Sequence, residues 1–181
     1  MALQTSGAIS LNDIHVEAGG SSGTNCTIND SDIRGLISKG SGATMSFNEW
    51  YGAYAAQEFT ITEGSYSNYY GYLDRTGGSI QFGSINPLVY VDTDGANRTC
   101  EGLLVQRGTL FFYLRDYTRT AGWTKIIILD GNGTTTYEFL RTSGNLVTYS
   151  GNNYNRWTWT SLPAGLVAQI NGSGTTTFQI V

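Results

Sequence analysis

Glu58-Phe59-Thr60-Ile61-Thr62 is the stretch at which the hydrophobic pattern of the chain changes to a period of two. Its apolar residues alternate with threonines, and because successive side chains of a strand point to opposite faces, this alternation predicts a half-buried β-strand. Upstream of the stretch, apolar residues recur at helical spacing. We therefore divide the chain into an N-terminal helical segment, residues 1–56, and a β domain, residues 57–181.

Downstream, short apolar runs are separated by Gly, Asn, Asp and Pro, which is typical of strands and tight turns. Asp130-Gly131-Asn132-Gly133 and Gln106-Arg107-Gly108 are predicted turns, and the Gly- and Tyr-rich residues 64–78 are expected to form a loop. Short strands at this spacing predict a mainly β fold with an antiparallel β-sandwich or jelly-roll-like domain. The further predicted strands are residues 79–82, 88–91, 102–106, 109–114, 124–129, 134–140, 146–149, 156–160, 166–170 and 175–181.

The last predicted strand, residues 175–181, is expected at a sheet edge. Edge strands present unpaired backbone groups, and in an oligomer such a strand can complete the sheet of a neighbouring copy. We therefore expect removal of these residues to abolish assembly.

A four-residue pattern occurs three times before the β domain: Ser10-Leu11-Asn12-Asp13, Thr27-Ile28-Asn29-Asp30 and Ser46-Phe47-Asn48-Glu49. Each copy contains a hydroxyl residue, an apolar residue, Asn and an acid. The hydroxyl can accept a hydrogen bond from the backbone N–H three residues later, while the acid accepts one from the N–H of the hydroxyl residue, which is a capping box. The copies predict short helices over residues 11–17, 28–38 and 47–54.

Helices of this length are unstable in isolation, so they must pack against one another or against a larger body. We interpret residues 1–56 as a docking segment; the plainer alternative is a small domain with ordinary capped helices. The residues predicted to carry docking are Ser10, Leu11, Asp13, Ile14, Thr27, Ile28, Asp30, Ser46, Phe47, Glu49, Trp50 and Tyr51.

Two of the copies, with their flanks, resemble a pattern of structural proteins of tailed bacteriophages. Ile9-Ser10-Leu11-Asn12-Asp13-Ile14, followed by Glu17 and Gly19-Gly20, is similar to I-S-L-x-D-I-x-x-E-x-G-G. Met45-Ser46-Phe47-Asn48-Glu49-Trp50-Tyr51-Gly52 is similar to I-S-M-x-E-Y-Y-G, with Trp50 where the pattern usually has Tyr or Phe.

The resemblance, which covers residues 2–52, implies a non-enzymatic structural role in a virion. It is strongest to tail, baseplate and tail-fibre-associated proteins, especially those of marine and cyanobacterial phages. The implied partners are other virion proteins and further copies of the chain. Two alternatives stay open: a capsid decoration or head-fibre protein, and a carbohydrate-binding adsorption module that recognises a host glycan.

The charge balance argues against a nucleic-acid partner, because phosphate backbones attract basic patches. The formal net charge is −4, and only ten Lys and Arg residues are scattered along the chain. No apolar stretch approaches the ~20 residues of a membrane-spanning helix, and the N-terminus has no signal-peptide pattern. We expect a protein made in the host cytoplasm and incorporated into the virion, with no membrane partner.

No residues show catalytic or metal-binding spacing, so we predict no enzyme, no cofactor and no metal site. His15 is the single histidine and is expected on the surface of a helix. Cys26 and Cys100 lack the spacing of a metal pair and are expected to be buried thiols. Residues 92–97 match a calcium loop only in part and are better interpreted as an acidic turn.

Five aromatic residues are candidates for an interface or a ligand site, because aromatic faces stack on sugar rings and anchor protein interfaces. The two tryptophans share one face of a predicted strand, where core packing is the simpler interpretation. For the three tyrosines, a protein interface is favoured over a glycan. These residues are Tyr69, Tyr70, Tyr72, Trp157 and Trp159.

Overall fold

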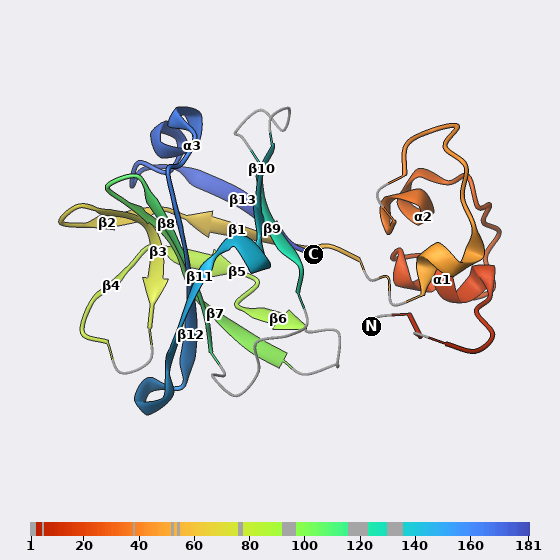
Figure 1. Cartoon of the computed structure of the whole chain (residues 1–181), viewed down its shortest axis with the longest axis horizontal. Helices are drawn as coiled ribbons and strands as arrows, with labels where there is room; N and C mark the ends of the chain where they lie inside the picture. The colour runs from red at the N-terminus through yellow and green to blue at the C-terminus, as the bar shows by residue number, and fades with distance from the viewer. Residues whose placement is uncertain are drawn as a thin grey trace. The chain divides into compact units, whose positions relative to one another are not determined.

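The computed structural model describes residues 3–4, 6–37, 39–51, 53, 55–75, 78–91, 97–115, 123–129 and 136–181. The chain forms two compact units, of which the first comprises residues 1–56 together with residues 91–96 and the second the rest of the chain; we call residues 1–56 unit 1 and residues 57–181 unit 2 (Figure 1). The fold is mainly β, as predicted, and the strands of both sheets pair antiparallel.

The described part of unit 1 contains the helices α1 (Leu11–Glu17) and α2 (Ser31–Gly35) and the 3-10 helix η1 (Phe47–Trp50). α1 follows the extended residue Ser10, whose side chain accepts a hydrogen bond from the Asp13 N–H. Beyond its end, Gly19 has a φ of +96°, a left-handed conformation that favours glycine. None of the helices in the described residues is long and apolar enough to cross a bilayer.

The second and third helices are shorter than predicted. In the second copy, the Asp30 N–H donates to the Thr27 carbonyl at 3.0 Å, so a turn precedes the helix, and α2 begins at Ser31 with Asp30 as its N-cap. In the third copy, Tyr51 is already extended with a ψ of 123°, so η1 ends at Trp50. The expectation of helices over residues 28–38 and 47–54 is therefore corrected.

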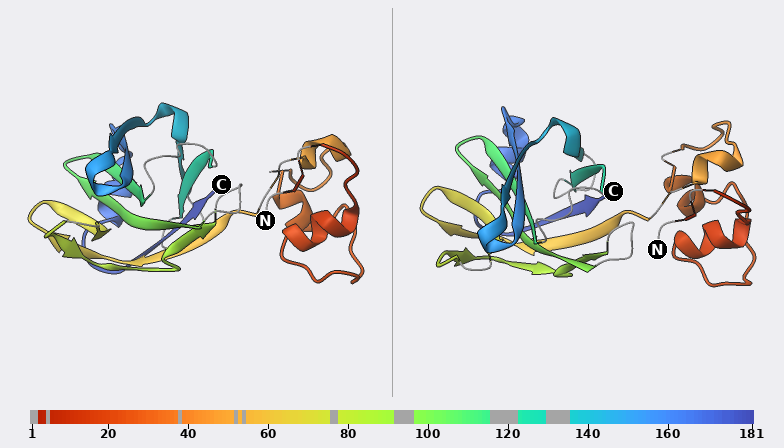
Figure 2. Two further views of the ribbon diagram at one scale, coloured as in Figure 1. Left: turned by 90° about the horizontal axis from the view of Figure 1, so that it is seen from below. Right: turned by 60° about the horizontal axis from the view of Figure 1, so that its bottom comes forward.

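Five strands of unit 2 form one sheet, in the order β10 (Thr136–Leu140), β9 (Lys125–Leu129), β13 (Thr175–Ile180), β1 (Gln57–Thr62) and β5 (Ser84–Asn86). In both views of Figure 2, β13 (blue) lies beside β1 (yellow). β13 is an inner strand, because Phe178 is opposite Phe59 of β1 on one side and Ile128 of β9 on the other. The predicted edge position of this strand is wrong, since the chain itself pairs both of its edges.

The second sheet has eight strands. Its main path is β11 (Asn145–Tyr149), β12 (Tyr154–Thr160), β8 (Thr109–Arg115), β7 (Asn97–Gln106), β3 (Tyr69–Asp74) and β2 (Gly64–Tyr66), with β4 (Gln81–Phe82) beside β3 and β6 (Val89–Val91) beside β7. The 3-10 helices η2 (Arg141–Ser143) and η3 (Ser150–Asn152) flank β11.

The turn predicted at residues 106–108 is confirmed. It joins β7 to β8, and Arg107 and Gly108 have φ values of +48° and +75°, which match a two-residue hairpin with both central residues left-handed. The hairpin predicted at residues 130–133 lies outside the described residues.

Two further expectations for unit 2 are wrong. The loop expected over residues 64–78 contains β2 and β3, which pair as a hairpin with Tyr66 opposite Tyr69. The strand expected at residues 166–170 is instead covered by the helix α3 (Ala164–Gln169), which follows Pro163. Leu166 and Ile170 are both fully buried, and their four-residue spacing is that of one helix face.

Both sheets of unit 2 contribute to one hydrophobic core. The rings of Phe59 and Phe178 stack with centroids 5.1 Å apart in the smaller sheet, and Phe112 of the larger sheet meets Phe178 edge-on at 6.2 Å. Burial of an aromatic side chain of this size contributes about 1.5–3 kcal/mol. Unit 1 has a separate core, formed by Leu3, Ile14, Ile33 and Trp50.

Candidate functional site

The acid of each repeat copy binds back to the first residue of the same copy. The backbone N–H of the first residue donates to the carboxylate of the fourth at 2.9 Å in all three: Ser10 to Asp13, Thr27 to Asp30, and Ser46 to Glu49. Hydrogen bonds lower the pKa of each of these carboxyl groups, chiefly the bond from the Ser10 side chain in the first copy and those from the backbone in the other two. Each carboxylate therefore holds the backbone at the start of a turn or helix.

Each copy is also followed by one fully buried side chain of the unit 1 core. Ile14, Ile33 and Trp50 each have 0% of their surface exposed. The Trp50 indole N–H donates to the Ile33 carbonyl oxygen at 3.1 Å, which joins the second copy to the third. The tryptophan that replaces Tyr or Phe of the phage pattern thus lies within this small core.

The remaining positions of the first motif also have structural contacts. The Glu17 carboxylate accepts a hydrogen bond from the Ala55 N–H at 3.1 Å, which fastens the end of unit 1 to α1. The His15 ring lies against Gly20, and its Nε2 is 2.8 Å from Thr24 Oγ1. The expected surface histidine is therefore a half-buried packing residue.

Most residues predicted to carry docking are used within unit 1. Ile14 and Trp50 are buried, and Leu11, Ile28 and Tyr51 are half-buried, with the Tyr51 hydroxyl donating to the Gly7 carbonyl. These residues of the pattern therefore stabilise unit 1 itself, and only part of the pattern remains available to a partner.

The large apolar side chains most exposed in the described part of unit 1 are Val16 and Phe47, at 44% and 45%. Val16 lines a groove of about 430 Å³ together with the carboxylates of Asp13 and Glu17. Of these groups, the sequence prediction included Phe47 and Asp13 and missed Val16 and Glu17.

The five candidate aromatics lie in separate environments. Trp157 and Trp159 are 2% and 6% exposed in the unit 2 core, and Tyr72 is 3% exposed, so these three are closed to a surface ligand. Tyr69 and Tyr70 are half-buried neighbours on β3 that pack against different clusters. They consequently line two different hollows.

The first hollow, which we call the outer-face groove, lies on the face of the eight-stranded sheet opposite the shared core and has a volume of about 250 Å³. A second apolar cluster forms its base, in which Leu104 and Tyr113 are buried on the side opposite Leu103 and Phe112. An antiparallel sheet commonly leaves one face to solvent, whereas this sheet has buried apolar side chains on both faces.

Two arginines lie over aromatic rings at this groove. The guanidinium carbon of Arg75 is 5.4 Å from the Tyr154 ring centroid, and Nη1 donates to the Tyr154 hydroxyl at 3.2 Å. The guanidinium of Arg156 is 5.6 Å from the Phe111 ring and 5.3 Å from the Tyr149 ring. These cation–π contacts position both cations by stacking rather than by ion pairing.

The second hollow, the hairpin-end pocket, has a volume of about 430 Å³. It lies beside the β7–β8 turn and is lined by residues that include Asn68, Tyr70, Arg107, Val167 and Asn171. It combines one aromatic ring with one cation, so it offers fewer aromatic contacts than the outer-face groove.

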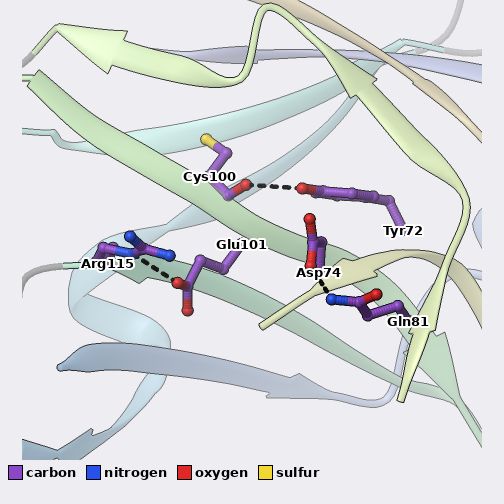
Figure 3. Close-up of polar contacts among 6 residues, drawn as sticks. All are labelled: Tyr72, Asp74, Gln81, Cys100, Glu101 and Arg115. Carbon is purple, nitrogen blue, oxygen red and sulfur yellow. Dashed lines mark hydrogen bonds and ion pairs between the residues drawn. The ribbon is translucent and has the colours of Figure 1, made fainter. Parts of the chain in front are cut away.

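The polar groups in Figure 3 have internal partners. Arg115 Nε is 2.8 Å from the Glu101 carboxylate, which is fully buried, and Gln81 donates to Asp74 at 2.5 Å. These contacts join β3, β4, β7 and β8, so we assign them a structural role.

Tyr72 and Cys100, also drawn in Figure 3, are joined by a hydrogen bond of 3.2 Å from the tyrosine hydroxyl to the Cys100 carbonyl. Burial raises the pKa of both the Tyr72 hydroxyl and the Cys100 thiol. The Cys100 thiol is therefore protonated at neutral pH, whereas Cys26 in unit 1 is only half-buried.

Among the described residues, no three His, Cys, Asp or Glu side chains lie together in a way that could hold a metal ion. The acidic turn predicted at residues 92–97 lies outside the described residues, apart from Asn97.

The sequence prediction missed Arg75 and Arg156 and the rings beneath them. A signal was present in residues 110–114, Leu-Phe-Phe-Tyr-Leu, which are apolar at both odd and even positions. A strand that is apolar on both sides indicates that both faces of its sheet are covered. Tyr154 and Arg156 alternate with the core residues of β12 in the same way.

Comparison of the chain with protein-family models, curated proteins and solved structures finds no match.

Proposed function

We propose that this chain is a non-enzymatic structural component of a tailed-phage virion, associated with the tail, baseplate or tail fibre. Unit 1 docks the protein to the particle, and unit 2 is a β-sandwich of its two sheets. The observation that carries the proposal is the coincidence of two features in one segment. Residues that resemble the phage pattern cap the helices α1 and η1 and also supply Ile14 and Trp50 to the core of unit 1.

The small size of the unit 1 core supports a docking role. Among its described residues four side chains are buried in this core, and a single core in a segment of this length supplies little stability. Such a unit gains stability by burying Val16 and Phe47 against a partner. The partner in this proposal is another virion protein, and assembly as a homo-oligomer is part of the same proposal.

The contacts of the buried carboxylates support a non-enzymatic role. Glu63 accepts hydrogen bonds from the backbone N–H groups of Asn171 and Gly172 and from the Thr176 hydroxyl, at 2.7–3.0 Å. Glu101 is paired with Arg115. Both carboxylates hold strands and loops together, and neither faces the outer-face groove or the hairpin-end pocket.

Antibody labelling of purified particles in electron microscopy tests the proposal. Label at the tail, baseplate or fibres is the expected result, whereas label over the capsid assigns the alternative role of a decoration or head-fibre protein. Absence of the chain from purified particles, measured by mass spectrometry, contradicts both.

A pair of variants tests docking through unit 1. Val16→Asp combined with Phe47→Asp places charge on the exposed apolar side chains of unit 1 and is expected to abolish incorporation into particles. Leu140→Asp is the matched control, because Leu140 is 52% exposed on unit 2. Equal incorporation of both variants would remove unit 1 as the docking element.

A further inference from the structure

We propose that the outer-face groove binds an acidic sugar residue, with Arg75 and Arg156 holding its carboxylate and the aromatic side chains contacting its ring. This site goes beyond the virion role proposed above and does not depend on it. The groove-lining residues on which the argument depends are Tyr69, Arg75, Gln106, Phe111, Tyr113 and Arg156.

The charge of the lining side chains favours an anion as the ligand of this groove. Its lining contains two arginines and no carboxylate, although the whole chain has fourteen acids and ten Lys and Arg residues. Within the described part of the chain, neither Arg75 nor Arg156 forms an ion pair with a carboxylate. Two guanidinium groups without a counter-ion, beside apolar walls, attract an anion.

The Arg156 side chain has a donor to offer. Its Nε is buried and lacks a hydrogen-bond partner among the described residues. A buried donor without an acceptor costs free energy that a bound carboxylate would recover. The planar guanidinium is already held between Phe111 and Tyr149, so little conformational freedom is lost on binding.

The neutral part of the groove selects a ring-shaped ligand with hydroxyl groups. The half-buried rings of Tyr69 and Phe111 provide aromatic surface of the kind that stacks on sugar rings, and the Gln106 amide can both donate and accept hydrogen bonds.

Size limits the occupant to a small one. The groove volume of about 250 Å³ is below the ~300–1,000 Å³ of pockets for drug-sized ligands. It therefore suits one ring of a chain whose other residues extend into solvent. A carboxylated hexose satisfies the charge, the ring and the size together.

Calorimetric titration of the full chain with oligosaccharides of galacturonic acid tests the site. The same oligosaccharides as methyl esters are the matched ligands, since they keep the rings and remove the charge. We expect the free acid to bind at least about tenfold more tightly than the ester, as hydrogen bonds to a charged group require. Equal affinity of acid and ester, or no binding of the acid, overturns the proposal.

Protein variants locate the binding to the groove. Arg156→Gln and Arg75→Gln are each expected to weaken binding of the acid about tenfold or more. Arg107→Gln removes the same charge outside the groove, at the exposed β7–β8 turn, and is expected to bind as the parent does. An equal loss in Arg107→Gln overturns the assignment to the groove. If Arg156→Gln fails to fold, as judged by its thermal unfolding, Arg75→Gln still tests the site.

The C-terminal carboxylate of a peptide is a second possible source of the same anion. Titration with such a peptide distinguishes it from the acidic sugar. Weaker binding of the peptide than of the galacturonic acid oligosaccharide is expected. Tighter peptide binding that depends on Arg156 would replace the sugar with a protein terminus as the ligand.

Discussion

At the scale of single residues, the His15 side chain determines which residue can occupy position 20. The φ of Gly20 is not in the left-handed region, unlike that of Gly19, so its backbone does not require glycine. An added Cβ would instead lie 2.1 Å from Cε1 of the His15 ring. The two glycines of the pair are therefore required for different physical reasons.

Gly20→Ala is expected to destabilise unit 1 by about 1 kcal/mol, because the His15 ring must move and lose its hydrogen bond to Thr24. Gly35→Ala is the control, since open space surrounds Gly35 and alanine favours the helix by about 0.5–1 kcal/mol. Hydrogen exchange of the unit 1 amides measures both changes. Equal protection in the two variants would show that the histidine contact contributes nothing.

Glu63→Gln is expected to destabilise unit 2 by about 1–3 kcal/mol. The amide NH2 group that replaces one carboxylate oxygen cannot accept a hydrogen bond, so the buried side chain no longer accepts all three bonds that Glu63 receives from the segment 171–176. Chemical denaturation measures the loss, with the exposed Glu58→Gln in β1 as a control expected to change stability by less than about 0.5 kcal/mol.

The three capping carboxylates act at the scale of elements, because each one fixes the start of a turn or helix. Asp13, Asp30 and Glu49 have pKa values below their ordinary values of 3.8, 3.8 and 4.5. A carboxyl group whose pKa is lower in the folded state stabilises that state above its ordinary pKa. Its contribution disappears as the pH falls through the lowered value.

Unit 1 is therefore expected to lose stability on acidification below the ordinary pKa values of these groups. Hydrogen exchange of unit 1 measured between neutral pH and pH 3 provides the test. The triple variant Asp13→Asn, Asp30→Asn, Glu49→Gln should begin with lower protection at neutral pH and change less on acidification. An unchanged pH profile in this variant would contradict the capping role.

Strand β13 contributes to its sheet through Phe178, which stacks on Phe59 and meets Phe112 across the core. Phe178→Ala is expected to destabilise unit 2 by about 3–5 kcal/mol, because the inner position leaves a cavity that cannot collapse. Thermal unfolding measures the loss, and Leu140→Ala, at an exposed position, is the control. A loss below about 1 kcal/mol for Phe178→Ala would contradict the inner position.

Strands with alternating apolar and polar residues, and strands joined by tight turns, could be predicted from the sequence. Elements whose conformation depends on tertiary packing could not. The turn at Arg107 and Gly108 follows from local backbone preferences, so sequence is sufficient there. Leu166 and Ile170 fit a short strand as well as a helix, and the core position of both residues favours the helix. Arg75 and Arg156 come together only because β3 and β12 belong to one sheet.

At the scale of the whole molecule, each unit has a core made from its own residues. The unit 1 core uses residues no later than Ala53, and the unit 2 core uses residues from Phe59 onward. This division matches two compact units whose main boundary lies between Ala56 and Gln57.

Residues 57–181 are therefore expected to fold without unit 1. Near-ultraviolet circular dichroism from Trp123, Trp157 and Trp159, which pack together in the core, should match that of the full chain after subtraction of the Trp50 signal. A fragment that lacks this signal, or that unfolds without cooperativity, would show that unit 2 depends on unit 1.

The inner position of β13 also sets an order of events during protein synthesis. Unit 1 can complete its core once residue 53 has left the ribosome, but β1 gains its β13 partner only after residues 175–180 have been made. Until then Phe59 and Ile61 lack a main part of their packing, and long-range strand pairing of this kind is slow. The nascent chain thus has a complete unit 1 core while the sheet that contains β1 still lacks an inner strand, so this sheet can be completed only after residues 175–180 have been translated.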